Sequence, residues 1–230
     1  YVPGVMCNKT CIDLEVYPPN GIHIELAWQV ADLPSDGGAG ADFDLHFAHE
    51  LAKHPGIQDE CAGAPYPWFD PLFDAYGIHS AMNWGVADPA VHDDPVLVDS
   101  LDGSKPELLD LAEPEGNLSK AAFYYIGVHY WNDHGHGAAT AKLRVFINGA
   151  AVAVLSRPMK PLDMWTVAKI HWPNAYVGGS FNPMDHCKQL GDPCAGGSGP
   201  WQKSGQACIN HCFKPEGWGA GNPPASGDCK

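Results

Sequence analysis

Apolar and polar residues alternate along several short stretches of the chain, which predicts β-strands with one buried face. In residues 21–30 (GIHIELAWQV) a large apolar residue occupies every second position from Ile22 to Trp28. Further stretches with strand character are 42–47, 121–131, 141–149 and 164–172. Asn148-Gly149 is a typical two-residue hairpin turn, so the residues that follow it are expected to return as an antiparallel strand.

Helical periodicity is scarce. A short helix is expected only near residues 48–53, and a single helical turn near residues 106–114. Strands without long interleaved helices predict a mainly β protein, an antiparallel β-sandwich with long loops over residues 55–116. Residues 1–173 are assigned to the sandwich domain. Residues 174–230, rich in Cys, Gly and Pro, are expected to form an irregular disulfide-rich C-terminal extension packed on it.

The chain is acidic: 13 Lys and Arg oppose 27 Asp and Glu among 230 residues, for a formal net charge of -14. This charge disfavours nucleic acids and anionic membranes as partners and favours divalent cations. No apolar run is long enough to span a bilayer. The sequence opens at Tyr1 without a recognisable signal peptide, so a secreted protein is expected here in its mature or trimmed form.

Cysteine usage predicts an oxidising, extracellular or cell-surface location. The even count, within Gly- and Pro-rich sequence, is typical of a disulfide framework. The eight cysteines are Cys7, Cys11, Cys61, Cys187, Cys194, Cys208, Cys212 and Cys229. Their pairing stays open, and zinc bound by Cys208 and Cys212, with His211 between them, is the alternative.

An acidic segment between residues 92 and 110 predicts a site for a hard cation such as Ca²⁺. Its carboxylates are those of Asp93, Asp94, Asp99, Asp102 and Glu107. Asp42 and Asp44 are expected on one face of their strand and could contribute further oxygen ligands. The spacing does not match an EF-hand, and a solvated acidic turn is the alternative interpretation.

Histidines offer a second candidate metal site. His129 lies in a predicted strand, where regular backbone would fix its side chain as a ligand requires. His134 and His136 occupy a turn sequence and are expected in solvent, whereas His46 and His49 would meet only on a helix. His79, in a loop with Trp84 five residues later, could join His129 if that loop lies along the strand. Two imidazoles are too few for Zn²⁺ but suit Cu(I).

Four stretches of the sequence together resemble the CorA/MopE family of copper-binding surface proteins of methane-oxidising bacteria. They are residues 26–49, 83–95, 124–150 and 164–173. The resemblance implies a β-sandwich that holds one copper ion, largely as Cu(I). In that family the ligands are two histidines and a kynurenine derived from tryptophan. His79, Trp84 and His129 fit the order and spacing of one of the arrangements in the family. Opening the indole ring would yield an aromatic amine that can ligate copper.

The leading expectation is therefore a monomeric, extracellular or cell-surface copper-binding protein with a role in copper acquisition, and not an enzyme. A calcium-stabilised surface or adhesion module without a copper function is the alternative. A copper enzyme that cleaves polysaccharides oxidatively is disfavoured, because such enzymes use an N-terminal histidine and this chain starts at Tyr1. Neither a Gly-x-Ser-x-Gly elbow nor a His-Glu-x-x-His motif is present in the sequence.

Overall fold

The computed structural model describes residues 20–30, 40–53, 58–59, 64–65, 67–80, 82–84, 94–117, 120–173, 178–183, 201–204 and 207–210. Asp93 lies outside the described residues, as do seven of the expected disulfide cysteines: Cys7, Cys11, Cys61, Cys187, Cys194, Cys212 and Cys229. His211, the third residue of the alternative zinc group, lies outside them too. For Cys208 the description extends to the backbone alone.

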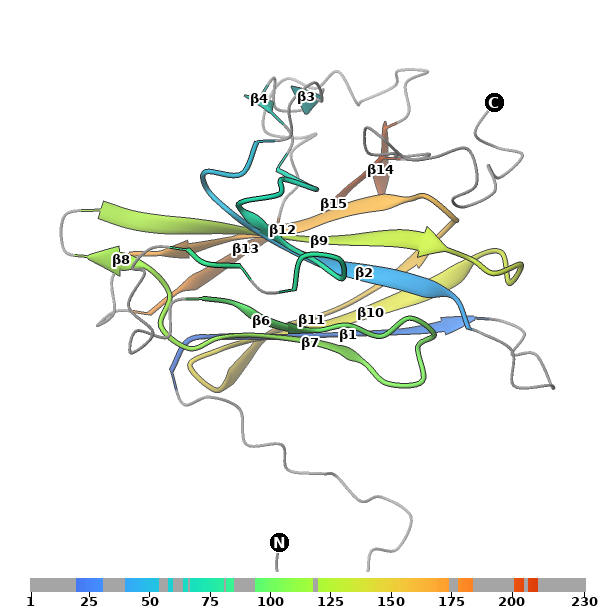
Figure 1. Cartoon of the computed structure of the whole chain (residues 1–230), viewed down its shortest axis with the longest axis horizontal. Helices are drawn as coiled ribbons and strands as arrows, with labels where there is room; N and C mark the ends of the chain where they lie inside the picture. Colours follow the sequence, from blue (N-terminus) through green and yellow to red (C-terminus); the bar gives the residue numbers. More distant parts are fainter. Residues whose placement is uncertain are drawn as a thin grey trace, which may run out of the picture.

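Two antiparallel sheets lie face to face (Figure 1). The first has the order β11 (Ala150–Met159), β10 (Ala139–Ile147), β1 (Ile22–Val30), β7 (Glu107–Leu111) and β6 (Val96–Val98). The second has the order β14 (Trp201–Ser204), β15 (Ala207–Asn210), β12 (Met164–Trp172), β9 (Lys120–Asn132), β2 (Asp42–His49) and β5 (Asp74–Ala75). We call these sheet A and sheet B.

Short strands complete the architecture. In sheet B, β13 (Ser180–Pro183) pairs with β12 and β8 (Gly116–Asn117) pairs with β9. The strands β3 (Gln58–Asp59) and β4 (Ala64–Pro65) pair only with each other. The described part of the chain contains no helix, and hence no helix that could cross a membrane. The mainly β, sandwich-like fold expected from the alternation is therefore confirmed.

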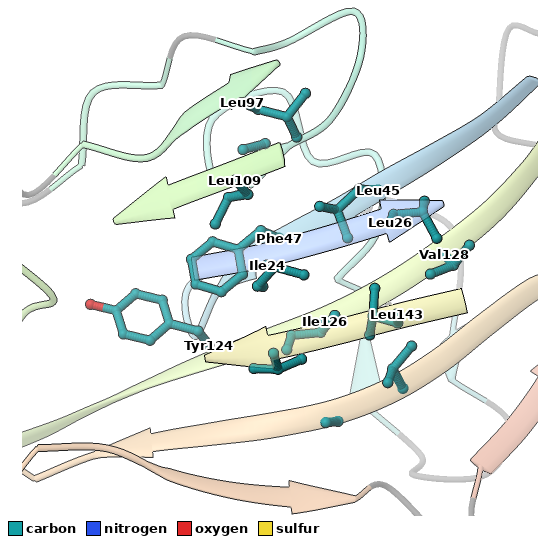
Figure 2. Packing of buried hydrophobic residues seen from close by; sticks show 14 of the residues in the cluster. Ile24, Leu26, Leu45, Phe47, Leu97, Leu109, Tyr124, Ile126, Val128 and Leu143 are labelled. Carbon is teal, nitrogen blue, oxygen red and sulfur yellow. The ribbon is translucent and has the colours of Figure 1, made fainter. Parts of the chain in front are cut away.

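The hydrophobic core fills the space between the two sheets (Figure 2). Sheet A contributes Ile24, Leu26, Leu97, Leu109 and Leu143, and sheet B contributes Leu45, Phe47, Tyr124, Ile126 and Val128. Nearly all of these side chains are fully buried. Burial of each aliphatic or aromatic side chain contributes about 1.5–3 kcal/mol, so this core supplies the main driving force that fixes the strand register.

The two helical predictions were wrong. Residues 48 and 49 end β2, where Ala48 and His49 pair with Tyr125 and Tyr124 of β9. Residues 107–111 form β7, which pairs with β1 and β6. In both places the hydrogen bonds and buried side chains offered by neighbouring strands outweigh a weak local preference for helix. The segment 55–116 is consequently not all loop, because β6 and β7 form one edge of sheet A.

The predicted hairpin is confirmed. Asn148 and Gly149 have φ values of 51° and 73°, and these two positive angles are those that a type I′ turn requires. The Asn148 side chain also accepts a hydrogen bond from the Gly21 amide at 2.9 Å, which ties the turn to the start of β1. The hairpin therefore fixes the register of β10 on β11 and, through Gly21, the position of β1 beside them.

Part of the outer face of sheet B is covered by residues 67–80. Trp68, Phe69 and Tyr76 from this segment pack with Ala48 of β2 and Met164 of β12 in a second apolar cluster. We call residues 67–80 the covering segment. Because of it, side chains that point away from the main core are buried as well, and the polar face of β2 becomes the floor of an enclosed site.

Trp68 reaches this position because residue 127 of β9 is glycine. A Cβ atom at Gly127 would lie 2.6 Å from the Met164 terminal methyl and 2.8 Å from the Trp68 ring. Both distances are shorter than carbon atoms tolerate, so only glycine lets the indole pack this close to the strand.

Candidate metal centre

Strands β2 and β9 bring Asp44, His46 and His129 together on the outer face of sheet B. Along β2 the apolar residues Phe43, Leu45 and Phe47 point into the main core, so Asp44 and His46 point the opposite way. In the register of the two strands Asp44 lies directly opposite His129. The alternation of β2 and this register together determine the grouping.

One potential ligand atom from each of Asp44, His46 and His129 lies within 4.8 Å of the other two. Both histidines are completely buried, and Asp44 is 7% exposed. Atoms that ligate a common ion at about 2.1 Å are themselves about 3–4 Å apart. Small side-chain rotations would therefore convert this arrangement into a coordination site with two nitrogen ligands and one oxygen ligand.

The orientation of His46 is fixed by Asp74 of β5. The Nδ1 atom of His46 lies 2.7 Å from Asp74 Oδ2, which also accepts a hydrogen bond from the Phe69 amide at 2.5 Å. An Nδ1–H donor to this carboxylate leaves the lone pair on Nε2, and that nitrogen is buried without a hydrogen-bond partner in the described structure. A carboxylate behind a histidine is the usual support of a metal-ligating imidazole.

Aromatic rings enclose both imidazoles. The His46 ring stacks on Tyr76 with centroids 4.9 Å apart, and the Phe69 ring lies at 68° to it with centroids 4.5 Å apart. His129 has Phe69 and Trp131 beside it, at 5.4 and 5.8 Å. Phe69 adopts a left-handed backbone conformation, with φ of 62°, that is costly for a residue other than glycine. The packed covering segment holds it there, above the two histidines.

A second group of potential ligands adjoins the first and shares Asp44 with it. It consists of Asp44, Asp99 and Glu107, again with one oxygen from each within 4.8 Å of the others. Glu107, at the start of β7 in sheet A, is fully buried and accepts a hydrogen bond from the Leu45 amide at 2.6 Å. The side chain of Glu107 thereby crosses from one sheet to the edge of the other.

The electrostatics of the carboxylates reflect their burial and mutual proximity. Burial, followed by repulsion from Asp42 and Asp99, raises the pKa of Asp44 well above its ordinary value. Burial and the charge of Asp44 do the same to the pKa of Glu107. Burial and Asp99 raise the pKa of Asp42 to about 7, against an opposing effect of His134. Without a cation, burial and mutual repulsion therefore favour the protonated form of these groups more than in an exposed carboxyl.

The predicted calcium residues divide into two sets. Asp99 and Glu107 come together, and Asp44, expected as an additional ligand, joins them. Asp94 instead accepts a hydrogen bond from the Trp84 amide at 2.7 Å. Asp102 accepts one from the Ser104 amide at 2.9 Å, and hydrogen bonds from the side chain and the amide of Ser104 lower the pKa of Asp102.

The predicted copper residues do not all meet in this structure. His129 belongs to the first group of ligands, but Trp84 is buried in the main core, where its ring packs on Phe47 and Tyr124. Those two residues face the core from β2 and β9, so sheet B separates the Trp84 ring from His129. His79 lies beside Tyr76 in the covering segment, with ring centroids 5.2 Å apart.

The other histidines singled out in the sequence have separate surroundings. His49 points into the core side of sheet B and packs on Trp84 at 5.5 Å, so His46 and His49 lie on opposite faces of the same strand. His134 lies in the turn after β9, where its Nδ1 is 2.5 Å from the Gly40 carbonyl oxygen. His171 stacks on Phe123 at 4.8 Å.

Sequence reasoning missed His46 and its support Asp74. A signal for His46 was present, because Asp42, Asp44 and His46 occupy alternate positions of one strand and must share a face. The helix expected at residues 48–53 obscured it. Asp74 carries no such signal, since its position depends on how the covering segment folds back onto β2.

The chain matches no protein-family model and no curated protein sequence. Among solved structures it is similar to a protein described as "unknown function protein SAV2460", with 15% sequence identity and a TM-score of 0.41. That similarity covers 72% of this chain and 87% of the other.

Proposed function

We propose that this protein binds one transition-metal ion between Asp44, His46 and His129, and that the ion is copper. The observation that carries the proposal is the buried His46 imidazole. Its Nδ1 bonds to Asp74, whereas its Nε2 has no hydrogen-bond partner in the described structure. The same imidazole forms a group with two further potential ligands, Asp44 and His129. A buried polar nitrogen without a partner costs free energy, and a metal ion would remove that cost.

The chemistry of the ligands supports copper. Two imidazoles and a carboxylate suit Cu²⁺, Zn²⁺ and Fe²⁺, and among divalent ions of the first transition row Cu²⁺ binds such ligands most tightly. Cu(I), the softer ion, would depend on the two histidines and gain little from Asp44. Asp44→Asn is therefore expected to weaken the binding of Cu²⁺ more than that of Cu(I).

The biological setting follows from the resemblance to the CorA/MopE family. It is a binding role rather than a catalytic one, outside the cell or at its surface, in copper acquisition. Copper limitation of the producing cells should then raise the amount of the protein in the surface or secreted fraction. An amount that is independent of copper supply would argue against this role.

The experiment that tests the proposal is a copper titration of chelator-stripped protein against a competing indicator, with each oxidation state in turn. His46→Ala should abolish tight binding, because it removes the ligand whose orientation is fixed by Asp74. His171→Ala is the matched control, since His171 lies on β12 of the same sheet and outside both ligand groups. It should bind copper as the unmodified protein does.

The same titration distinguishes the proposed ligands from the arrangement predicted by resemblance, which consists of His79, Trp84 and His129. His129→Ala does not discriminate, because His129 is common to both arrangements. Retained binding in His46→Ala, together with loss in His79→Ala or Trp84→Phe, would overturn the proposal in favour of that arrangement. Mass spectrometry of Trp84 for conversion to kynurenine provides an independent check.

A further inference from the structure

We infer that Asp44, Asp99 and Glu107 form a second site, for a calcium ion, and that Asp44 is a ligand shared by the two sites. The calcium site stands on its own observations, whereas the sharing of Asp44 rests on the proposed function.

The first observation is the route by which Glu107 reaches the group. Strand β2 pairs with β5 only at Phe47 and Ala48, so the Leu45 amide on that edge has no strand partner. Oε2 of Glu107 accepts this amide's hydrogen bond at 2.6 Å from the opposite sheet. Oε2 is thus engaged by a backbone hydrogen bond, which fixes the carboxylate so that the side chain lies beside Asp44 and Asp99.

The second observation is that the remaining oxygens lack donors. Oε1 of Glu107 and Oδ1 of Asp99 are buried and receive no hydrogen bond from an amide, hydroxyl or cationic group of the described residues, so these two carboxyls can bond only to each other, through a shared proton. No lysine or arginine in those residues forms an ion pair with Asp44, Asp99 or Glu107. Fully buried Glu107 therefore directs an unsatisfied oxygen toward two further carboxylates. Such a group is stable only if protons or a cation neutralise it.

The third observation is the close approach of the covering segment at Gly77. A Cβ atom at this position would lie 2.6 Å from Asp44 Oδ1 and 2.8 Å from Asp99 Oδ1. The absence of a side chain leaves both oxygens room beside the backbone. Gly77 thus closes one side of the carboxylate group without displacing its oxygens.

The nature of the ligands selects the ion. The group offers only carboxylate oxygens, which hard cations prefer over Cu²⁺ or Zn²⁺. Ca²⁺ tolerates irregular arrangements of oxygen ligands, whereas Mg²⁺ demands a near-ideal octahedron. Asp42, whose charge interacts with Asp99, lies next along the same face of β2 and could complete the ligands.

Asp44 is the residue that connects the sites. Its carboxylate belongs to both ligand groups, the first with His46 and His129 and the second with Asp99 and Glu107. A carboxylate has two oxygens and can bind a separate cation with each of them. The structure therefore predicts two neighbouring ions of different chemistry, joined through one side chain.

The inference is tested by measuring calcium and copper binding to chelator-stripped protein, to four ligand variants and to one control variant. Glu107→Gln and Asp99→Asn should lose saturable Ca²⁺ binding and keep copper, and His46→Ala should lose copper and keep Ca²⁺. Asp44→Asn should lose Ca²⁺ and weaken the binding of Cu²⁺. Asp102→Asn is the matched control, because its exposed carboxylate comes from the same segment and should be dispensable.

Two results would overturn the inference: stripped protein that binds no Ca²⁺ saturably, or Glu107→Gln that binds it unchanged. Should Glu107→Gln fail to fold, Asp99→Asn decides, because Asp99 is partly exposed. If Asp44→Asn weakens the binding of only one of the two ions, Asp44 is not a ligand shared by both sites. If copper binding survives in His46→Ala while calcium binding is intact, the proposed function fails and the calcium site stands.

Discussion

Asp44 of β2 and His129 of β9 lie directly opposite each other in the strand register, and both are buried although they face away from the main core. This relationship places an acidic and an imidazole ligand on regular backbone, where neither side chain depends on a loop for its position. Metal sites built on strands are better ordered before the ion binds than sites on loops.

Asp74→Asn should lower copper affinity about 10- to 100-fold, as is usual for a residue that supports a metal ligand. The amide can no longer act as a charged acceptor for His46 Nδ1, so the tautomer and orientation of the ring are less well fixed. Competition titration measures the effect. The matched control is Asp110→Asn, because Asp110 makes the same kind of contact with His23 at 2.7 Å on sheet A. Equal affinity losses in both variants would contradict a specific role of Asp74.

Gly127→Ala should destabilise the fold by about 1–3 kcal/mol, the usual cost of overpacking, and should weaken copper binding. The added methyl group would displace the Trp68 ring, which lies beside His46 with centroids 5.8 Å apart. Urea denaturation and copper titration measure the two effects. Gly135→Ala is the control for copper binding: its φ of 85° strains an alanine, but a Cβ atom there meets nothing within 4 Å, so stability should fall without a change in copper affinity. Unchanged copper affinity in Gly127→Ala would show that Trp68 does not shape the site.

The cation-free protein should lose stability as the pH rises from about 5 to about 8. Burial raises the pKa of Asp44, Glu107 and Asp42, the last to about 7. A carboxyl group whose pKa is raised on folding binds protons more tightly in the folded state. Its contribution to stability is greatest at low pH and is lost as the pH passes its folded pKa. Melting temperatures of chelator-treated protein should therefore fall over this range.

Two comparisons make the pH prediction specific. Asp42→Asn should show a shallower fall, because one of the titrating groups is removed. Saturating Ca²⁺ should flatten the profile as well, since it replaces the protons as the neutralising charge. A melting temperature that rises between about pH 5 and about pH 8 without cations would be evidence against these shifts.

Removal of calcium should lower the melting temperature of the unmodified protein at neutral pH. A ligand that binds only the folded state at 100 times its dissociation constant stabilises that state by about 2.7 kcal/mol. Thermal denaturation with and without a calcium-selective chelator measures the change. In Glu107→Gln the chelator should have no effect. A chelator effect of equal size in that variant would locate the calcium elsewhere.

The main strands and the hairpin at Asn148-Gly149 could be predicted from the sequence. An alternating pattern indicates which residues share a face, and a turn dipeptide indicates where the chain reverses. What alternation does not state is whether the polar face is exposed. Asp44 and His46 are polar residues of β2, and the expectation for such residues is contact with water. They are buried because the covering segment packs over them, and nothing local in β2 encodes that contact.

The same limit explains the outcome for the candidate sites. Asp99 and Glu107 could be grouped because they are close in sequence, and Asp44 because it shares a strand face with Asp42. The approach of Glu107 to the Leu45 amide depends on how one sheet packs on the other, which spacing does not reveal. Trp84 is a similar case, since its core position depends on the aromatic residues that receive it.

The contact of Glu107 with the Leu45 amide has a consequence for the motions of the sandwich. An amide in the middle of a strand ordinarily exchanges its hydrogen with solvent when the strand separates from its neighbour. At Leu45 the acceptor is a side chain from the opposite sheet, so this amide exchanges when the contact between Glu107 of β7 and β2 opens. Its exchange rate therefore reports the opening of this contact between the two sheets, separately from the separation of β2 from its neighbouring strand.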